Sequence, residues 1–272
     1  MEGIDHKHYH DEEFDHHLLL ETYVGHDKTD SKDELMNMPL QKLFEVLSSG
    51  TVKGETLIDL TIAPNFSHLL VAADFFKEIF ILDSSDSSLT ETEKWLNKET
   101  GAVDWSHAAH FSCELKGVSC QEEEHRSTFT SEHLEAEEEK FRRIVKRCLK
   151  WDPTNDNPLG SVVLPQVDCA ISVWYLGTCK DHDSFRNSLK KFLSLVKVGG
   201  HVILFVLFNG TYYTIGDHRF SMLNFNEEFV KEVLQDNGYT TVICEVCESK
   251  LNTDLVDYKQ TGYIVARKES EI

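Results

Sequence analysis

Short apolar runs alternate with helix-like segments from residue 56 onward, and this alternation constrains the fold more than any other feature. The runs comprise residues 56–60, 79–82, 167–173, 201–208, 241–246 and 263–266. Their length and apolar character are typical of strands buried on both faces. The intervening helix-like segments comprise residues 66–73, 88–96, 185–196 and 225–237. Strands that alternate with helices predict an α/β, doubly wound, mainly parallel sheet covered on both faces.

Two segments depart from this alternation. Residues 1–50 read as helical because apolar side chains recur there at helical spacing, and we assign them to the same domain as residues 51–268. Residues 121–140 hold two acidic clusters around a Ser/Thr stretch, which predicts a solvated loop or the start of a charged helix that continues through Leu149. No repeat or linker divides the 272 residues, so one domain is the economical interpretation.

Charge and composition exclude several classes of protein. The 27 Lys and Arg against 47 Asp and Glu give a net charge of −20, which argues against nucleic acid or an anionic membrane as a partner. No apolar run approaches the ~18 residues of a membrane helix, and the polar, acidic start predicts no secretory signal. Seven scattered cysteines favour reduced thiols and a cytoplasmic location. We expect no metal site, because Cys244 and Cys247 lie in a predicted strand without a second pair and the N-terminal histidines read as a solvated terminus.

Ligands of a parallel α/β sheet bind outside the carboxyl ends of its strands. Asp83 ends the second predicted strand, where a carboxylate can accept both hydroxyls of a ribose; the alternative is that it caps the following helix, helped by Ser84 and Ser85. Asp152 precedes Pro153, and turn initiation is the simpler interpretation there.

A series of short motifs carries a resemblance over most of the chain, from Phe14 to Lys268. In order, the motifs are Val52–Asp59, Phe76–Ile79, Glu93–Leu96, Asp104–Ser106, Pro158–Gly160, Asp168–Cys169, Val198–Gly200, Tyr212–Gly216 and Ala266–Lys268. The chain resembles the nicotinamide, phenylethanolamine and indolethylamine N-methyltransferase family. That resemblance implies a Rossmann-like, seven-stranded methyltransferase sheet with an N-terminal helical lid, S-adenosylmethionine as cofactor and methyl transfer to a small amine.

The resemblance also implies where the cofactor binds. The implied cofactor-binding residues are Tyr23, Thr61, Ile62, Ala63, Asp83, Ser88, Asp152, Pro153 and Val173. Asp83 would hold the ribose and Asp152 the adenine amino group. Tyr23 keeps one aromatic residue of the lid, whereas Leu19 and Val24 stand at places where the family has tyrosines, and Ser88 replaces an Asn that reaches the ribose.

The loop after the first predicted strand departs from the family pattern. The family reads Asp-Ile-Gly-Ser-Gly-Pro there, and this chain reads Asp59-Leu60-Thr61-Ile62-Ala63-Pro64. Glycine lets the backbone approach the methionine end of the cofactor, and a β-branched Thr61 is poorly suited to a backbone angle chosen for glycine. This predicts weaker cofactor binding or a lost cofactor site.

The implied acceptor pocket has also changed. Val206, next to Leu207, stands where the family has an acidic residue, and Met222 stands where it has a polar one, although Tyr212 and Tyr213 persist. Such a pocket disfavours a charged amine, so the expected acceptor is an amine or a neutral aromatic molecule. In-line displacement needs no strong base, and no catalytic residue is assigned.

Two hypotheses for the function follow. The chain is either a small-molecule N-methyltransferase, expected to be a monomer, or a catalytically inactive paralogue that binds a small molecule or acts as a scaffold.

Overall fold

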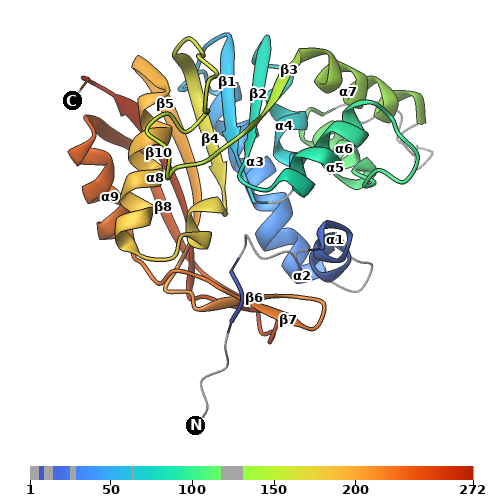
Figure 1. Cartoon of the computed structure of the whole chain (residues 1–272). Coiled ribbons are helices and arrows are strands. Elements are labelled where there is room, and N and C mark those ends of the chain that lie inside the picture. Colours follow the sequence, from blue (N-terminus) through green and yellow to red (C-terminus); the bar gives the residue numbers. More distant parts are fainter. Residues whose placement is uncertain (1–5, 9–14, 25–28, 63, 118–130, 272) are drawn as a thin grey trace.

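The computed structural model of the protein describes residues 6–8, 15–24, 29–62, 64–117 and 131–271. Its main sheet has seven strands in the order β3-β2-β1-β4-β5-β10-β8 (Figure 1). The strands are β1 (Thr56–Leu60), β2 (Glu78–Asp83), β3 (Val145–Lys150), β4 (Val167–Val173), β5 (Val196–Phe208), β8 (Tyr239–Glu248) and β10 (Gln260–Lys268). β10 pairs antiparallel with β5 and β8, and the other pairs are parallel. The predicted α/β, mainly parallel fold is confirmed.

Alternate residues of the central strands enter two separate cores, one on each face of the sheet. In β1, Ile58 and Leu60 belong to one core and Leu57 to the other, and all three are fully buried. The first core packs against α8 (His182–Ser194) and α9 (Glu227–Asp236). The second packs against α3 (Met38–Ser48), α4 (Ser67–Ala72), α5 (Asp86–Leu96), α6 (Ser106–Leu115) and α7 (Ser131–Ile144). The two-sided burial explains why these strands read as continuous apolar runs.

A close approach between two chain segments fixes the start of the central strands. The carboxylate Oδ2 of Asp168 accepts hydrogen bonds from the backbone amides of Glu55 (2.8 Å) and Thr56 (3.0 Å). A Cβ on Gly54 would lie 2.0 Å from the Cβ of Asp168, so only glycine fits there. Burial raises the pKa of Asp168, but its ion pair with Lys197 and the amide hydrogen bonds outweigh burial and hold the pKa at about 2.

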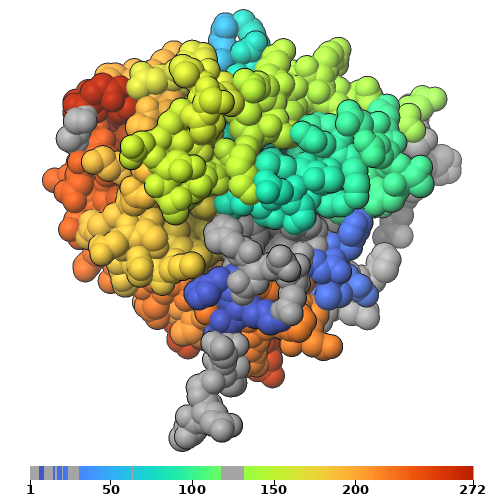
Figure 2. Space-filling model, in the orientation of Figure 1, coloured from blue at the N-terminus to red at the C-terminus, as the bar shows by residue number. Residues whose placement is uncertain are grey.

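A second, three-stranded sheet and the N-terminal helices lie together beyond the carboxyl ends of β1 and β2 (Figure 1). On the surface, blue N-terminal residues lie against orange residues of this region (Figure 2). The sheet contains β6 (Tyr212–Ile215), β7 (His218–Ser221) and β9 (Val256–Asp257), and the helices are α1 (His16–Val24), α2 (Thr29–Lys32) and the π-helix η1 (Asp33–Asn37). The hydroxyl of Tyr23 donates to the carbonyl of Leu255 (3.0 Å) and accepts from the amide of Thr214 (3.2 Å). These bonds dock α1 on β6.

One helix boundary was predicted wrongly. The charged helix expected to continue through Leu149 ends at Ile144, and Val145–Lys150 forms β3 at an edge of the sheet. Within the described part of the chain β3 pairs with β2 alone, and most of its side chains are partly or fully exposed, so it lacks the apolar run that reveals the central strands. The short strands of the small sheet and α6 were not predicted. Residues 121–130 of the acidic segment lie outside the described residues.

Cys244 and Cys247 lie in β8, as predicted, and the six cysteines among the described residues are free thiols. Within the described segments, no helix is long and apolar enough to cross a bilayer. The same residues contain no group of three or more His, Cys, Asp or Glu side chains placed to hold a metal ion.

Candidate functional site

The loop after β1 is joined to the end of β4 by a buried threonine. Thr61 is 3% exposed, and its hydroxyl donates to Asp59 Oδ1 (3.1 Å) and accepts from the amide of Val173 (3.3 Å). Neither Thr61 nor Ile62 has a positive φ, so the expected conflict with a glycine-type backbone angle is absent at these two residues. Thr61 therefore differs from a glycine at this position in its side chain and not in its backbone conformation. Ala63 lies outside the described residues.

A buried histidine contacts the aspartate that receives the Thr61 hydroxyl. Nε2 of His68 in α4 lies 2.7 Å from Asp59 Oδ1, and both residues are 1% exposed. His68 Nδ1 has no hydrogen-bond partner among the described residues. The pair holds the Asp59 carboxylate in place to receive the Thr61 hydroxyl. Sequence analysis did not identify this contact, because nothing in the local pattern brings residues 59 and 68 together.

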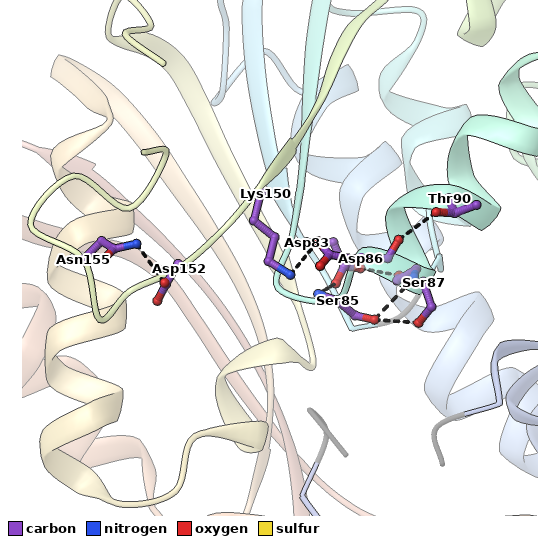
Figure 3. Close-up of polar contacts among 9 residues, drawn as sticks. Asp83, Ser85, Asp86, Ser87, Thr90, Lys150, Asp152 and Asn155 are labelled. Atoms are coloured by element: carbon purple, nitrogen blue, oxygen red, sulfur yellow. Dashed lines mark hydrogen bonds and ion pairs between the residues drawn. The ribbon is translucent and has the colours of Figure 1, made fainter. Parts of the chain in front are cut away.

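Asp83 lies at the end of β2 and is buried (Figure 3). Its Oδ1 accepts from the amide of Ser85 (2.8 Å) and its Oδ2 from the hydroxyl of Ser88. The N-cap of α5 is Ser85, whose hydroxyl accepts from the amide of Ser88 (3.3 Å). Asp83 therefore fixes the start of the helix without capping it, and Ser88 is fully buried against its carboxylate.

Asp152 forms the turn that follows β3 (Figure 3). Its Oδ1 accepts from the amide (2.9 Å) and hydroxyl (2.6 Å) of Thr154, and its Oδ2 accepts from the side chain of Asn155 (2.8 Å). The hydrogen bonds from Thr154 lower the pKa of Asp152. The carbonyl of Pro153 accepts from Asn187 and Lys191, which ties this turn to α8. Turn initiation by Asp152 is confirmed.

A small void lies between the ends of β1 and β2. Asp83 lines it together with Asp59, Thr61 and Asn65, and it holds about 190 Å³ of empty space. Pockets that bury a small ligand usually hold roughly 300 Å³ or more. Apolar side chains, among them Phe66 and Leu82, complete the wall of the void. The void, called the niche below, is therefore a small space of mixed lining that an entire nucleoside cofactor would have to enlarge.

An apolar cavity adjoins this void on the side of the N-terminal helices. It holds about 650 Å³ of empty space, including its open mouth. Its walls are Leu19, Tyr23, Leu35, Met36, Ile62, Asn65, Trp174, Gly177, Thr178, Leu207, Tyr213, Met222 and Val256. None of these described residues is acidic or basic, so the cavity offers no counter-charge to a cation.

Of the four predicted acceptor residues, the structure places two in the cavity wall and two outside it. Leu207 and Tyr213 line the apolar cavity, and the Tyr213 ring stacks on Phe220. Val206 is buried in the core and is not part of the wall. Tyr212 lies outside the cavity with the guanidinium of Arg219 4.2 Å from its ring centroid. The side chain of Val24 is outside the described residues.

Several wall residues were not predicted. Three of them, Trp174, Gly177 and Thr178, lie within five residues after the end of β4. Ligands of such sheets bind beyond the carboxyl ends of strands, so the position of the third predicted strand was a usable signal for these residues. Trp174 adopts a left-handed backbone (φ 62°), and its Nε1 donates to the carbonyl of Leu35 (3.0 Å). Asn65 lines both the void and the cavity.

Solved structures with a similar arrangement of strands and helices include methyltransferases. The magnesium protoporphyrin IX methyltransferase of Synechocystis with bound SAM superposes with a TM-score of 0.54 at 10% identity, covering 93% of this chain and 90% of that one. An S-adenosylmethionine-dependent methyltransferase of Clostridium acetobutylicum gives 0.53 at 11% identity, covering 93% and 97%. The fold is that of the S-adenosylmethionine-dependent methyltransferases.

Sequence relatives narrow the class to one family. Nicotinamide N-methyltransferase of Sus scrofa is 37% identical over 244 residues, 89% of this chain and 88% of the relative. Indolethylamine N-methyltransferase of Mus musculus is 32% identical (95% and 94% covered), and phenylethanolamine N-methyltransferase of Sus scrofa is 30% identical (88% and 82%). The pattern of the NNMT/PNMT/TEMT family matches residues 3–269. The chain belongs to that family of small-molecule N-methyltransferases.

Proposed function

We propose that the protein transfers a methyl group from S-adenosylmethionine to a small, uncharged acceptor seated in the apolar cavity. One observation carries this proposal: the niche beside Asp83 and the apolar cavity share a wall at Asn65. Methyl transfer needs its two reactants side by side in water-excluded surroundings, and two adjoining spaces meet that need.

The nucleoside end of the cofactor fits the residues at the strand ends. The Asp83 carboxylate is buried at the end of β2, where Oδ1 accepts from the amide of Ser85 and Oδ2 from the hydroxyl of Ser88. This places a charged acceptor at a strand end, where the ribose hydroxyls of a nucleoside cofactor bind in folds of this kind. Asp152 lies on the next loop, with its carboxylate held by Thr154 and Asn155. We propose that these two carboxylates hold the ribose and the adenine amino group.

The methionine end meets a loop without glycine. Thr61 lies in the wall of the niche, and removal of its side chain would enlarge the niche. We therefore propose that this protein binds S-adenosylmethionine more weakly than a chain with glycine at that position.

The residues of the cavity would orient the acceptor and exclude water from it. When bound, the cofactor supplies an electrophilic methyl group. The apolar walls at Ile62, Leu207 and Met222 exclude water from the acceptor, and the ring of Tyr213 offers a flat surface against which an aromatic acceptor can stack. Because an unprotonated nitrogen is already nucleophilic, no general base is needed for attack.

A second candidate function is that of a catalytically inactive small-molecule-binding protein. The observation that favours it is the internal satisfaction of the niche: Thr61 bonds to Asp59 and Val173, while Ser88 bonds to Asp83. In this alternative the apolar cavity binds a ligand without a cofactor beside it.

Two measurements on the full chain separate the candidates. Calorimetric titration with S-adenosylmethionine and S-adenosylhomocysteine measures the cofactor Kd, and transfer of a radiolabelled methyl group measures activity on a panel of neutral aromatic nitrogen compounds and protonated amines. Transfer with neutral acceptors as the best substrates supports the enzyme. Transfer that is best with charged amines contradicts the neutral acceptor. The absence of cofactor binding at millimolar concentration supports the inactive binding protein.

A further inference from the structure

Asn65 occupies an unusual place in the apolar cavity. It is 5% exposed, belongs to the loop between β1 and α4, and lies in the wall that the cavity shares with the niche. Its carbonyl oxygen accepts from the hydroxyl of Ser67 (2.8 Å). Its amide nitrogen faces the sulfur of Met36 at 3.6 Å, and Met36 is itself a wall residue. The hydrogen bond from Ser67 thus sets which end of the carboxamide points toward the cavity.

The amide nitrogen has hydrogen-bonding capacity that the protein does not use. A carboxamide nitrogen carries two N–H donors, and a thioether sulfur is a weak acceptor. Among the described residues this nitrogen has no oxygen or nitrogen partner. A buried donor without a strong acceptor is unfavourable, and a ligand that brings an acceptor atom removes that penalty.

Neighbouring donors of the wall already have partners. The Tyr23 hydroxyl donates to the carbonyl of Leu255, and the indole N–H of Trp174 donates to the carbonyl of Leu35. The hydroxyl of Thr178 donates to the carbonyl of Tyr175 (2.8 Å). These three groups hold the wall together, whereas the Asn65 amide nitrogen contacts only the Met36 thioether among the described residues and can donate to a ligand.

We propose that Asn65 is a specificity-determining residue that donates a hydrogen bond to an acceptor atom of the molecule in the apolar cavity. The ligand class that fits is a neutral, flat, largely apolar compound with one carbonyl or ether oxygen or one unprotonated ring nitrogen. Two effects disfavour a cation here. The apolar wall does not replace its lost hydration, and the positive end of the N–H dipole repels its charge. This inference rests on the proposed function in treating the cavity as the acceptor site.

Three compounds of one shape test the proposal by calorimetric titration of the full chain without cofactor. Indane has no polar atom, 1-indanone adds one carbonyl acceptor, and protonated 1-aminoindane adds a cation. We expect 1-indanone to bind about tenfold more tightly than indane, as one hydrogen bond to an otherwise unsatisfied donor predicts, and 1-aminoindane to bind most weakly.

Variants assign the preference to Asn65. Asn65→Leu removes the amide at similar size, and we expect the ratio of the two Kd values to fall to about one. Asn65→Ala serves the same purpose if the leucine variant fails to fold. Asn237→Leu is the matched control, because Asn237 lies at the end of α9 outside the cavity wall and its amide donates to the carbonyl of Val233 (2.7 Å), so the ratio should stay near that of the natural protein.

A ratio near one in the natural protein overturns the proposal, as does a tenfold ratio that survives in a folded Asn65 variant. A preference for 1-aminoindane also overturns it. Because indane and 1-indanone hold no nitrogen to methylate and no cofactor is added, the outcome is independent of methyl transfer. An Asn65-dependent ratio in a chain without activity would contradict the proposed enzyme and leave this inference standing.

Discussion

At the scale of single residues, the departures from the family pattern are built into the hydrogen bonding of the protein. Thr61 joins the ends of β1 and β4 through Asp59 and Val173, and Ser88 closes on Asp83. Thr61 and Ser88 therefore each have protein partners, and these bonds fix both side chains at the ends of the strands.

Substitutions of Thr61 separate its hydroxyl from its bulk. Thr61→Val keeps the branched shape, leaves the Val173 amide without this acceptor and leaves the Asp59 carboxylate with His68 but without the Thr61 hydroxyl, so the free energy of unfolding should fall by about 1–2 kcal/mol. Thr61→Ser keeps the hydroxyl and should cost less than about 1 kcal/mol.

Thr61→Gly should lower stability most and yet bind S-adenosylmethionine about 5- to 150-fold more tightly, because it removes the side chain from the niche. Urea denaturation and calorimetric titration provide the two readouts. Unchanged cofactor affinity in Thr61→Gly would show that the side chain is not the obstacle.

His107 in α6 gives the protein a defined sensitivity to acid. Burial lowers its pKa to about 4, with a further contribution from Lys32, while Asp104 opposes the shift. An unfolded histidine has a pKa of about 6.5, so between these values the unfolded state binds more protons and stability falls as the pH drops from about 6.5 to 4. Since the side chain is partly exposed, the expected loss is on the order of 1–2 kcal/mol, below the full value of the shift.

The variant His107→Gln should remove this part of the acid sensitivity. The measurement compares the free energy of unfolding of variant and natural protein at pH 7 and pH 4.5. We expect the difference between the two proteins to change by about 1–2 kcal/mol in favour of the variant at the lower pH. Parallel curves would mean that His107 titrates normally in the folded state.

At the scale of elements, the sequence predicted best what is buried on both faces. The runs of β1, β4 and β5 are apolar because helices cover both sides, and their positions were predicted within a few residues, apart from an earlier start of β5. β3 has one strand neighbour and exposed side chains, and Phe141, Ile144 and Val145 happen to continue a helical spacing into it. The small sheet could not be predicted, because strands of two to four residues carry too little periodicity.

The candidate site was predicted only where a local sequence signal marks its residues. Asp83 and Asp152 follow strands or precede proline, which are local signals. The roles of Asn65 and His68 depend on which residues the tertiary structure brings opposite them, namely Met36 and Asp59. Strand position alone also does not decide which of Val206 and Leu207 faces the cavity, because adjacent residues of a strand point to opposite faces.

The docking of α1 can be tested through Tyr23. Tyr23→Phe removes a hydroxyl that donates to Leu255 and leaves the amide of Thr214 without its acceptor. We expect amide hydrogen exchange in α1 and β6 to accelerate about fivefold to tenfold, as the loss of roughly 1–1.4 kcal/mol of local stability predicts, while β1 and β4 keep their protection. Tyr212→Phe is the control, because the Tyr212 ring lies outside the cavity and should leave exchange in α1 unchanged. Equal exchange in both variants would mean that α1 is held by other contacts.

At the scale of the whole molecule, the binding spaces lie where the sheet, the N-terminal helices and the small sheet meet. The niche is lined by residues of β1, β2 and the loop after β1, and the cavity adds walls from α1, η1 and β6. Occupation of the niche should therefore stabilise the fold as a whole, because a ligand that binds only the folded state raises the free energy of unfolding by mass action.

Thermal unfolding with S-adenosylhomocysteine tests this coupling between the niche and global stability. A ligand present at 100 times its Kd adds about 2.7 kcal/mol, which in a domain of this size corresponds to a rise in Tm of roughly 5–10 °C. Asp83→Asn keeps the shape and the acceptor for the Ser85 amide, but it exchanges a charged ribose acceptor for a neutral one, so the variant should fold and show less than half of that rise. Asp86→Asn is the matched control: Asp86 lies in the first turn of α5, is exposed and pairs with Lys150 (2.7 Å), so the variant should keep the full rise. A rise that survives in Asp83→Asn would place the ligand outside the niche, whereas a rise lost equally in both variants would trace the effect to the fold of α5 and away from recognition of the ribose by Asp83.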